Sequence, residues 1–294
     1  MEGFSISQLA QFSGIKAHTI RAWEQRYNAL TPGRSVGNTR YYSNDQLKRL
    51  LNIVSLLDYD HKVSQLCVMQ DEELHELLEE KKHDESGDMK YGFYISQLIS
   101  AGVIYDELYF EKIFANCLLT IGFKETYSMV IVPLLKRLGL MWRIDKLPPA
   151  QEHFVSNLIR QKIFVAIDSL PPPKSEKGTA ILFLPENEFH EIPLLFAHFI
   201  LRFHEVKSIY LGANVPKGSL LETVRAIEPD HLLFFLVHQD IPENVNLWIS
   251  ELSEVHIGNI FVAGNTTLLK KLDNGKKDQL KIIHSITDLE NYFT

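Results

Sequence analysis

Basic side chains are concentrated at the start of the 294-residue chain. The first 65 residues carry eight Lys/Arg and five Asp/Glu, a balance of +3 in a chain of net charge −7, so the remainder carries −10. Lys and Arg pair with phosphates, and a basic end on an acidic body indicates a nucleic-acid contact confined to that end. Eight side chains suit such a contact: His18, Thr19, Arg21, Arg26, Arg34, Asn38, Arg40 and Tyr41.

Local sequence signals predict the elements that position these side chains. Capping boxes, in which Ser is followed three residues later by Gln, predict helix starts at Ser5 and Ser43. Gly14 is expected to end the first helix, and a second is expected over about 17–27, with the first four candidate side chains on it. Turn residues over 32–38 then predict a hairpin that carries the other four.

A helix pair followed by a hairpin offers one helix to the major groove and a wing to the DNA backbone. Some residues of this region have a structural alternative. Trp23 is expected in the core because its indole is large and apolar. Glu24 is expected on the helix surface or in an ion pair rather than as a base reader, and Arg26 can equally be a solvated charge.

Five segments together resemble one family of DNA-binding regulators: Phe4–Ala10, Gly14, Thr19–Tyr27, Pro32–Arg34 and Gly37–Tyr42. Their order, a helix, an Arg-x-Trp-Glu-x-Arg-Tyr helix and a wing ending in Arg-Tyr-Tyr, is similar to that of the MerR family of winged-helix regulators. The resemblance covers about residues 4–70. It implies dimers on a palindromic operator, with the second helix reading bases and the wing holding phosphates.

Two polar stretches, about 80–88 and 169–178, predict linkers that divide the chain into three domains. We expect a multidomain α and α/β protein: a winged helix-turn-helix at 1–75, a four-helix bundle at 89–168 and a flavodoxin-like, Rossmann-type sheet at 178–294. The bundle follows from long helical periodicity with breaks near Gly102 and Gly122.

The last domain alternates between apolar runs short enough for buried strands and amphipathic segments. This alternation predicts a parallel sheet covered on both faces, which binds ligands at the carboxyl ends of its strands. The expected strands are Ala180–Leu184, Ser208–Leu211, Leu232–Val237, Asn259–Val262 and Lys281–His284. The expected helices are Glu191–Phe203, Gly218–Ile227, Val245–Leu252 and Thr266–Leu272.

One carboxylate and one imidazole follow the first of these strands. A neutral histidine at a strand's carboxyl end can become a metal ligand, and a nearby carboxylate can hold its other ring nitrogen. Glu188 and His190 have that spacing. Taken alone, His190 is a loop histidine without a ligand, Trp142 a core residue and His153 a satisfied histidine.

These residues occur in an order similar to that of cobalamin-binding modules. Trp142, Glu152 and His153 resemble the helical cap that faces the upper side of the corrin ring. Glu188-x-His190 resembles the signature whose histidine is the lower ligand of cobalt, which makes His190 the implied metal ligand. The segment 211–216 looks like the family's loop after its second strand, and Gly264 falls at its glycine turn. The resemblance covers about residues 89–294.

The sequence departs from that pattern at four positions. Pro193 replaces a glycine, so a flexible position becomes one with fixed φ and no N–H. The strand end at 235–238 lacks the family's serine, and Ala263 stands for a first glycine. Arg143 stands where light-sensing cobalamin repressors carry a second histidine, so we do not expect a histidine-trapped photoproduct. Cobalamin, another ligand and no cofactor all remain open.

The resulting hypothesis is a cytoplasmic regulator that binds double-stranded DNA as a homo-oligomer, a dimer or tetramer, with ligand binding coupled to oligomerisation. A competing hypothesis is a MerR-type regulator whose body has lost the cofactor and binds a protein partner. An enzyme is not expected, because the basic head does not suit a corrinoid enzyme subunit. Cys67 and Cys117 form no metal or disulfide pattern, and we expect no run long enough to span a membrane.

Overall fold

The computed structural model describes residues 3–34, 38–57, 61–81, 87–143, 149–173, 178–237, 245–272 and 279–293, without the side chains of residues 11, 79–81, 87–90 and 140–143. The chain divides into two compact units, Met1–Asn157 and Leu158–Thr294. The division falls inside a single helix, α9 (Pro149–Asp168). The three domain boundaries expected from the sequence therefore stay a prediction.

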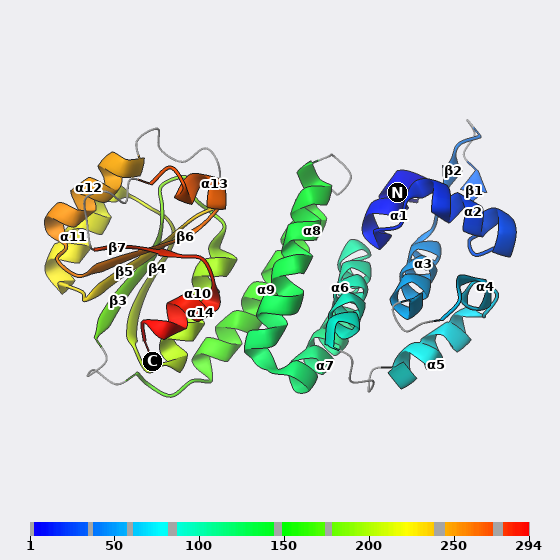
Figure 1. Cartoon of the computed structure of the whole chain (residues 1–294), viewed down its shortest axis with the longest axis horizontal. Coiled ribbons are helices and arrows are strands. Elements are labelled where there is room, and N and C mark those ends of the chain that lie inside the picture. Colours follow the sequence, from blue (N-terminus) through cyan, green and yellow to red (C-terminus); the bar gives the residue numbers. More distant parts are fainter. Residues whose placement is uncertain are drawn as a thin grey trace. The chain divides into compact units, whose positions relative to one another are not determined.

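The first unit is helical apart from one short hairpin (Figure 1). Its first 81 residues, here called the head, hold the hairpin and five helices. These are α1 (Ile6–Ser13), α2 (Ala17–Tyr27), β1 (Gly33–Arg34), β2 (Arg40–Tyr41), α3 (Asn44–Leu57), α4 (Val63–Leu66) and α5 (Asp71–Lys81). The expected winged helix-turn-helix is present, and the short α4 and α5 are additional to it.

Caps explain where the head's helices begin. Ser5 closes a complete capping box, in which its Oγ accepts from the Gln8 N–H and its own N–H donates to Gln8 Oε1. The box expected at Ser43 is only half formed. Ser43 Oγ accepts from the Gln46 N–H at 3.3 Å, but the Gln46 side chain accepts from the Thr31 N–H instead. That bond ties α3 to the segment before the wing.

Four further helices, the expected bundle helices, follow the head: α6 (Gly87–Val103), α7 (Glu107–Glu125), α8 (Val132–Arg143) and α9. A π-helical turn, η1 (Thr126–Ile131), joins α7 to α8. Gly122 has φ of +76° and kinks α7, in agreement with the break expected there. A Cβ on Gly102 would lie 2.3 Å from Val155 Cγ2, so this glycine lets α6 and α9 pack closely.

Within the first unit, a buried polar seam joins the head to α6 and α7. Gln97 on α6 is fully buried, and its amide nitrogen donates to Asn52 Oδ1 at 3.2 Å and lies 3.4 Å from Ser55 Oγ, both on α3. The Tyr109 hydroxyl on α7 donates to Gln97 Oε1 at 2.7 Å. Because buried amides are costly unless paired, these bonds favour one relative placement of the head and these helices.

The second unit contains a five-stranded parallel sheet in the order β4-β3-β5-β6-β7. In order of sequence the strands run 2-1-3-4-5, the flavodoxin-like order expected from the alternation. The strands are β3 (Thr179–Pro185), β4 (Lys207–Val215), β5 (His231–Leu236), β6 (Asn259–Gly264) and β7 (Leu280–Ile283). The expected loop at 211–216 is wrong, because β4 continues through Val215.

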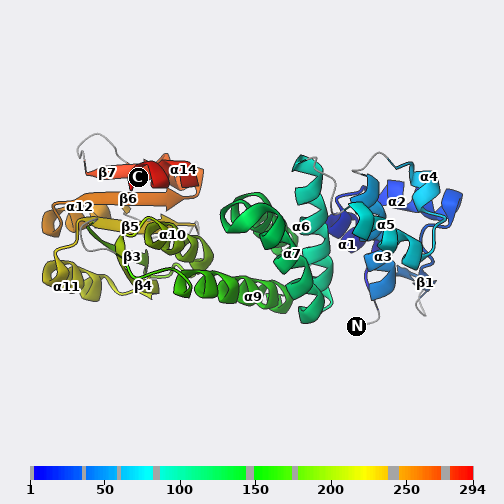
Figure 2. The same ribbon diagram turned by 90° about the horizontal axis from the view of Figure 1, so that it is seen from below.

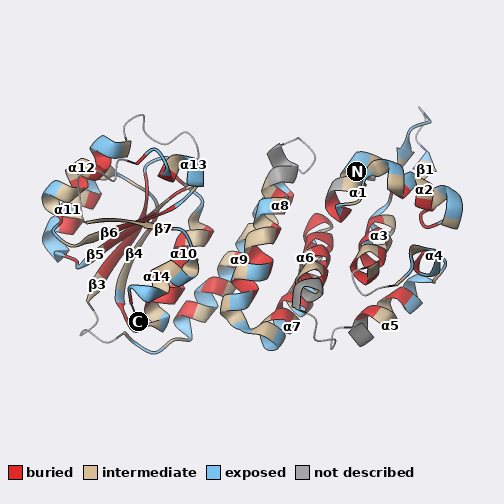
Figure 3. Cartoon of the chain, viewed as in Figure 1, coloured by how far each residue is buried: buried red, intermediate tan, exposed pale blue. Residues whose placement is uncertain are grey.

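Helices cover both faces of this sheet, as Figures 1 and 2 show. They are α10 (Glu191–Phe203) and α14 (Ile286–Asn291) on one face, α11 (Lys217–Ile227) and α12 (Val245–Val255) on the other, and α13 (Thr266–Leu269) after β6. The central strands are buried along their length (Figure 3). Phe183, Phe234 and Trp248 pack with ring centroids 5.0–5.8 Å apart, which explains the apolar strand sequences.

One helical run among the described residues, Glu107–Gly139, has the length and hydropathy of a membrane span, contrary to the expectation from the sequence. Only 28% of its most apolar window is buried. The same run contains the kink at Gly122 and the Lys124–Glu125 pair, and it packs against α6 in the first unit. We therefore describe it as a helix of a folded domain.

Candidate DNA-binding head and ligand loop

The side chains predicted to contact DNA lie on α2 and the hairpin of the head. His18, Arg21 and Arg26 are exposed on α2, and Thr19 is half-buried beside them. Ile20 and Trp23 are buried, which confirms the core role expected of Trp23 and turns the opposite face of α2 outward. An exposed polar face on the second helix is what major-groove reading requires.

The hairpin carries the second group of candidates. Arg34, Asn38 and Arg40 are exposed and Tyr41 is half-buried. Arg34 donates from Nη1 to Asn38 Oδ1 at 2.5 Å, which orders this part of the wing. A Cβ on Gly33 would lie 2.4 Å from the Tyr41 ring, so a larger residue there would displace this tyrosine. The expected turn includes Gly37, which lies outside the described residues.

Glu24 connects these two groups. Its side chain is only 8% exposed, one oxygen accepts a hydrogen bond from the Tyr42 hydroxyl, and the other lies 3.9 Å from Arg40 Nε. The ion-pair reading of Glu24 is therefore confirmed. Burial and the hydrogen bond to Glu24 raise the pKa of Tyr42, so the phenol stays a donor.

In the second unit, the ligand loop, residues 186–190, follows β3 at the carboxyl edge of the sheet. Glu188 is fully buried, and its Oε1 lies 2.6 Å from His190 Nδ1 and accepts from the His190 N–H at 3.0 Å. Because Glu188 Oε1 accepts from the His190 N–H as well, we assign Nδ1 as the ring nitrogen that donates to it. The His190 side chain is 50% exposed. The loop thus presents an oriented, accessible imidazole.

Neighbouring strand ends hold this loop in place. Glu188 Oε2 accepts from the Val237 N–H at 2.9 Å at the end of β5. Asn214, with φ of +55°, accepts from the Asn187 N–H at 2.9 Å through Oδ1, and its own N–H donates to the Glu188 carbonyl at 3.1 Å. The loop follows β3, which lies between β4 and β5 in the sheet. The chain order of the strands reverses at β3, and sheets of this kind bind ligands in the crevice outside the carboxyl ends of the strands at such a point.

Gly264 ends β6 at the same edge, with φ of +136°. A Cβ there would lie 2.1 Å from the Leu236 carbonyl oxygen, so the close approach of β6 to β5 explains this glycine without a ligand. Pro193 lies in the first turn of α10, where the missing N–H has no partner within the helix. Proline therefore suits α10 locally.

Part of the second unit's surface next to the ligand loop is an ionic network. Glu191, the residue after His190, accepts from Arg160 Nη2 at 2.5 Å and from the Tyr210 hydroxyl at 2.8 Å. His198 stacks on Tyr210 with ring centroids 5.1 Å apart, and burial lowers the pKa of His198 to about 4. This network anchors the start of α10 to α9 and β4.

The residues expected to face the upper side of a corrin ring belong to the first unit. Glu152 and His153 adjoin at the start of α9, with His153 Nδ1 3.1 Å from Glu152 Oε2 and the His153 side chain 72% exposed. Ser156 Oγ donates to Glu152 Oε1 at 2.6 Å. Trp142 lies in α8, but its side chain is outside the described residues. How these residues relate to His190 stays a prediction.

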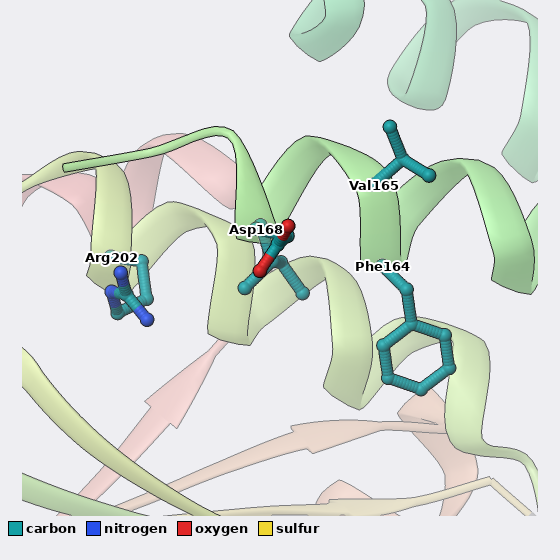
Figure 4. Close-up of a pocket in the computed structure, with 5 residues that line it drawn as sticks. Phe164, Val165, Asp168 and Arg202 are labelled. Atoms are coloured by element: carbon teal, nitrogen blue, oxygen red, sulfur yellow. The ribbon is translucent and has the colours of Figure 1, made fainter. Parts of the chain in front are cut away.

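Within the described parts of the chain, no three His, Cys, Asp or Glu side chains form a metal-binding group. A shallow groove of about 480 Å³ lies elsewhere in the second unit, where Phe164, Val165 and Asp168 project from α9 and Arg202 from α10 (Figure 4). It shares no residue with the ligand loop.

Sequence reasoning missed several residues that shape these sites. Tyr42 and Asn214 hold the wing and the ligand loop, and the Val237 backbone N–H holds Glu188. The Tyr-Tyr end of the wing was a signal for Tyr42 within the family pattern. No sequence signal marks a backbone N–H that only a neighbouring strand brings into place.

Comparison with known families agrees with both geometries. Residues 4–69 match the MerR HTH family regulatory protein model, and residues 94–166 match the B12 binding domain model. The chain therefore combines a MerR-family DNA-binding head with a B12-binding domain. The second match covers α6 to α9, including the long apolar run described above.

The chain is homologous to two HTH-type transcriptional repressors of Myxococcus xanthus. It is 28% identical to CarH over 234 residues, 77% of this chain and 76% of CarH. It is 26% identical to CarA over 240 residues, 81% of this chain and 78% of CarA. These relatives are transcriptional repressors and not enzymes, in agreement with the expectation that this chain is a DNA-binding regulator.

A solved structure shares the fold of the helical region and the parallel sheet that follow the head. The Methanosarcina barkeri monomethylamine corrinoid protein matches with a TM-score of 0.53 and 14% identity, over 65% of this chain and 92% of that protein. At this identity the likeness shows the fold alone. It confirms the expected combination of a helical region with a parallel, Rossmann-like sheet.

Proposed function

We propose that this chain regulates transcription by binding operator DNA through its head, and that its body binds cobalamin with His190 as the cobalt ligand. The observation that carries the cobalamin part is the clamp on His190. A fully buried carboxylate holds Nδ1 at 2.6 Å, which orients a ring that is 50% exposed at the ligand edge of the parallel sheet.

The head supplies the two kinds of contact that DNA recognition needs. His18, Thr19, Arg21 and Arg26 on α2 are proposed to face base edges and adjacent phosphates in the major groove. The wing residues Arg34, Asn38, Arg40 and Tyr41 are proposed to hold phosphates. We further propose a homo-oligomer on a palindromic operator, because each head offers one recognition helix and so reads one half-site. The proposed location is the cytoplasm.

The residues of the ligand loop fit the lower face of cobalamin. Bound cobalamin would supply a cobalt centre, and neutral imidazole is a common metal ligand. Glu188 would keep the ring proton on Nδ1 and raise the basicity of Nε2, while its bond to the Val237 N–H keeps the loop in register with β5. Gly264, Glu152, His153 and Trp142 stay proposed ligand-facing residues.

The test is DNA binding by the full-length protein with and without adenosylcobalamin. A duplex enriched from a random library by the protein itself serves as operator. A ligand shifts DNA affinity only by its differential affinity for the two arrangements of the protein, and a coupling of about tenfold is typical. We expect such a shift in the parent and in His284→Ala, an exposed control, and none in His190→Ala, which should still bind the duplex.

A second candidate is a regulator whose body binds a protein partner and no cofactor. Pro193 replaces the family's glycine, and Phe189 beside His190 is 64% exposed, a large apolar side chain at the surface. In that case cobalamin would leave the DNA affinity of parent and variant unchanged. A shift that His190→Ala abolishes would exclude this candidate.

A further inference from the structure

The recognition helix and the wing of the head are separate elements that share one buried carboxylate. Glu24 lies on the third turn of α2, and its side chain is 8% exposed. Tyr42, which follows β2 and is fully buried, donates its hydroxyl to Glu24 Oε1. The Tyr42 backbone in turn pairs with Phe4, at 2.8 Å and 2.9 Å in the two directions. The hydroxyl of a fixed tyrosine therefore fixes the carboxylate.

The second oxygen of Glu24 faces a cation at the surface. Glu24 Oε2 lies 3.9 Å from Nε of Arg40, whose side chain is 43% exposed. Since the ion pair is made through Nε, the terminal nitrogens of the guanidinium can take a second partner. Those nitrogens can form the paired hydrogen bonds that a phosphate accepts. Arg21 on α2 and Arg40 on β2 both act electrostatically on the Tyr42 hydroxyl, so both arginines flank this site.

A buried carboxylate is costly unless it is paired, which makes this contact informative. An apolar residue at position 24 would pack beside Tyr42 without desolvating a charge. The carboxylate instead joins a residue of the wing core, Tyr42, to a residue of the wing surface, Arg40, from the body of α2. The two carboxylate oxygens of Glu24 therefore link α2 to both the core and the surface of the wing.

We propose that Glu24 is a positioning residue for DNA recognition, which sets the wing arginine Arg40 relative to the recognition helix without touching DNA itself. A phosphate contact made by a clamped wing fixes the register of α2 on the duplex. The same contact made by a loosened wing still attracts DNA but leaves the register free. Glu24 thus acts on the ratio of specific to non-specific affinity more than on affinity itself.

The experiment is a double-mutant cycle on the full-length protein. The variants are Glu24→Gln, Arg40→Ala and the double variant, and the control is Asp45→Asn, which removes the same charge from an exposed position of the head. Gln keeps an oxygen that accepts from Tyr42 but removes the charge facing Arg40. Each protein is titrated with the duplex that the parent enriches from a random library and with a scrambled duplex, over a series of salt concentrations.

We expect Glu24→Gln to lower the scrambled-to-enriched Kd ratio about tenfold, by weakening the enriched duplex alone. In the Arg40→Ala background the same change should alter the ratio less than about twofold, because the clamped cation is gone. Asp45→Asn should leave the ratio unchanged. Equal effects of Glu24→Gln in both backgrounds, or equal weakening of both duplexes, would overturn the proposal.

A second pair of variants covers the case in which Glu24→Gln lowers the melting temperature of the protein. Arg40→Gln and Arg34→Gln each remove one wing arginine and leave the Glu24–Tyr42 bond intact. We expect Arg40→Gln to lower the Kd ratio and Arg34→Gln to weaken binding of both duplexes alike. The reason is that Arg40 pairs with Glu24, whereas Arg34 donates to Asn38. Equal ratios would overturn the proposal. The inference rests on DNA binding by the head, and a parent that enriches no duplex would refute that function itself.

Discussion

The head and the α/β unit each present a nitrogen side chain at the surface by means of a buried carboxylate. In the head, Glu24 lies 3.9 Å from Arg40, a permanent cation, and accepts from Tyr42. In the α/β unit, Glu188 lies 2.6 Å from His190, a titratable ring, and also accepts two backbone N–H bonds. The first carboxylate is held by side chains, whereas the second is built into the sheet edge.

The difference fits the two tasks proposed for these side chains. DNA phosphates attract any arginine within reach, so a cation in a loose ion pair is enough to bind a phosphate. The direction in which that cation is held helps to fix the register of the head on the duplex. A metal ligand must offer one particular nitrogen with its lone pair, so the ring needs a short bond to its other nitrogen and a rigid support. Substitutions should therefore damage stability in the α/β unit and selectivity in the head.

The largest effect is expected where the sheet edge supports Glu188. Gly264→Ala should destabilise the α/β unit by about 3 kcal/mol or more, because φ of +136° is strained for alanine and its Cβ would lie 2.1 Å from the Leu236 oxygen. Urea unfolding followed by fluorescence of the buried Trp248 measures this change. Gly218→Ala is the control: nothing lies within 4 Å of a Cβ there, and alanine favours the helix.

Removing the carboxylate of the ligand loop should cost somewhat less. Glu188→Ala leaves the two part-buried N–H donors of His190 and Val237 without their acceptor, and we expect a loss of about 2–3 kcal/mol. Hydrogen exchange should localise the loss to the ends of β3 and β5. Glu186→Ala, at an exposed position of the same loop, should change neither. Unchanged exchange at the Val237 amide would contradict the role given to Glu188.

The corresponding change in the head should be smaller. Tyr42→Phe removes the hydroxyl that donates to Glu24 and should destabilise the head by about 1–2 kcal/mol, because the carboxylate keeps its partner Arg40 and part of its hydration. Tyr41→Phe at the half-buried neighbour should cost less than about 0.5 kcal/mol. Circular dichroism during thermal unfolding compares the two variants. Equal losses would contradict a clamp through Tyr42.

The smallest effect is expected from the titration of one histidine of the α/β unit, His198. Burial lowers the pKa of His198 to about 4, below its unfolded value, so the folded state binds the proton only at a lower pH than the unfolded state does. Stability is then complete above about pH 6.5 and falls as the pH drops toward 4. At pH 6 we expect a loss of about 1 kcal/mol in the parent that His198→Phe reduces. An unchanged loss in His198→Phe would assign it to other groups.

Much of the architecture follows from sequence pattern. Continuous apolar runs gave all five strands and their parallel order, and α10 begins and ends at the residues expected for it. The order of motifs indicated both binding regions. The short helices α4, α5 and α14 were missed because few apolar residues mark them. The end of β4 was misplaced, because Gly212 and Asn214, both with positive φ, resemble a loop yet remain within the strand.

The residue types of the two candidate sites were predictable from the sequence, but the hydrogen bonds that hold those residues in place were not. The Glu188-x-His190 spacing indicated the histidine clamp, whereas the bonds from Val237 and Asn214 depend on strands that lie far apart in the sequence. Gly264 was expected to contact a ligand, and its packing against Leu236 gives an independent reason for glycine there. Half of the capping box at Ser43 was redirected for the same reason, since the fold brings Thr31 to Gln46.

The most direct test is the absorbance of the full-length protein after incubation with cobalamin and desalting. We predict a corrin spectrum that the parent retains, with a band shift typical of an axial histidine, and that His190→Ala loses while still binding duplex DNA. Glu188→Gln should retain the spectrum with weaker affinity. A parent that emerges from desalting colourless, or a spectrum that His190→Ala leaves unchanged, would contradict the proposal that His190 is a metal ligand.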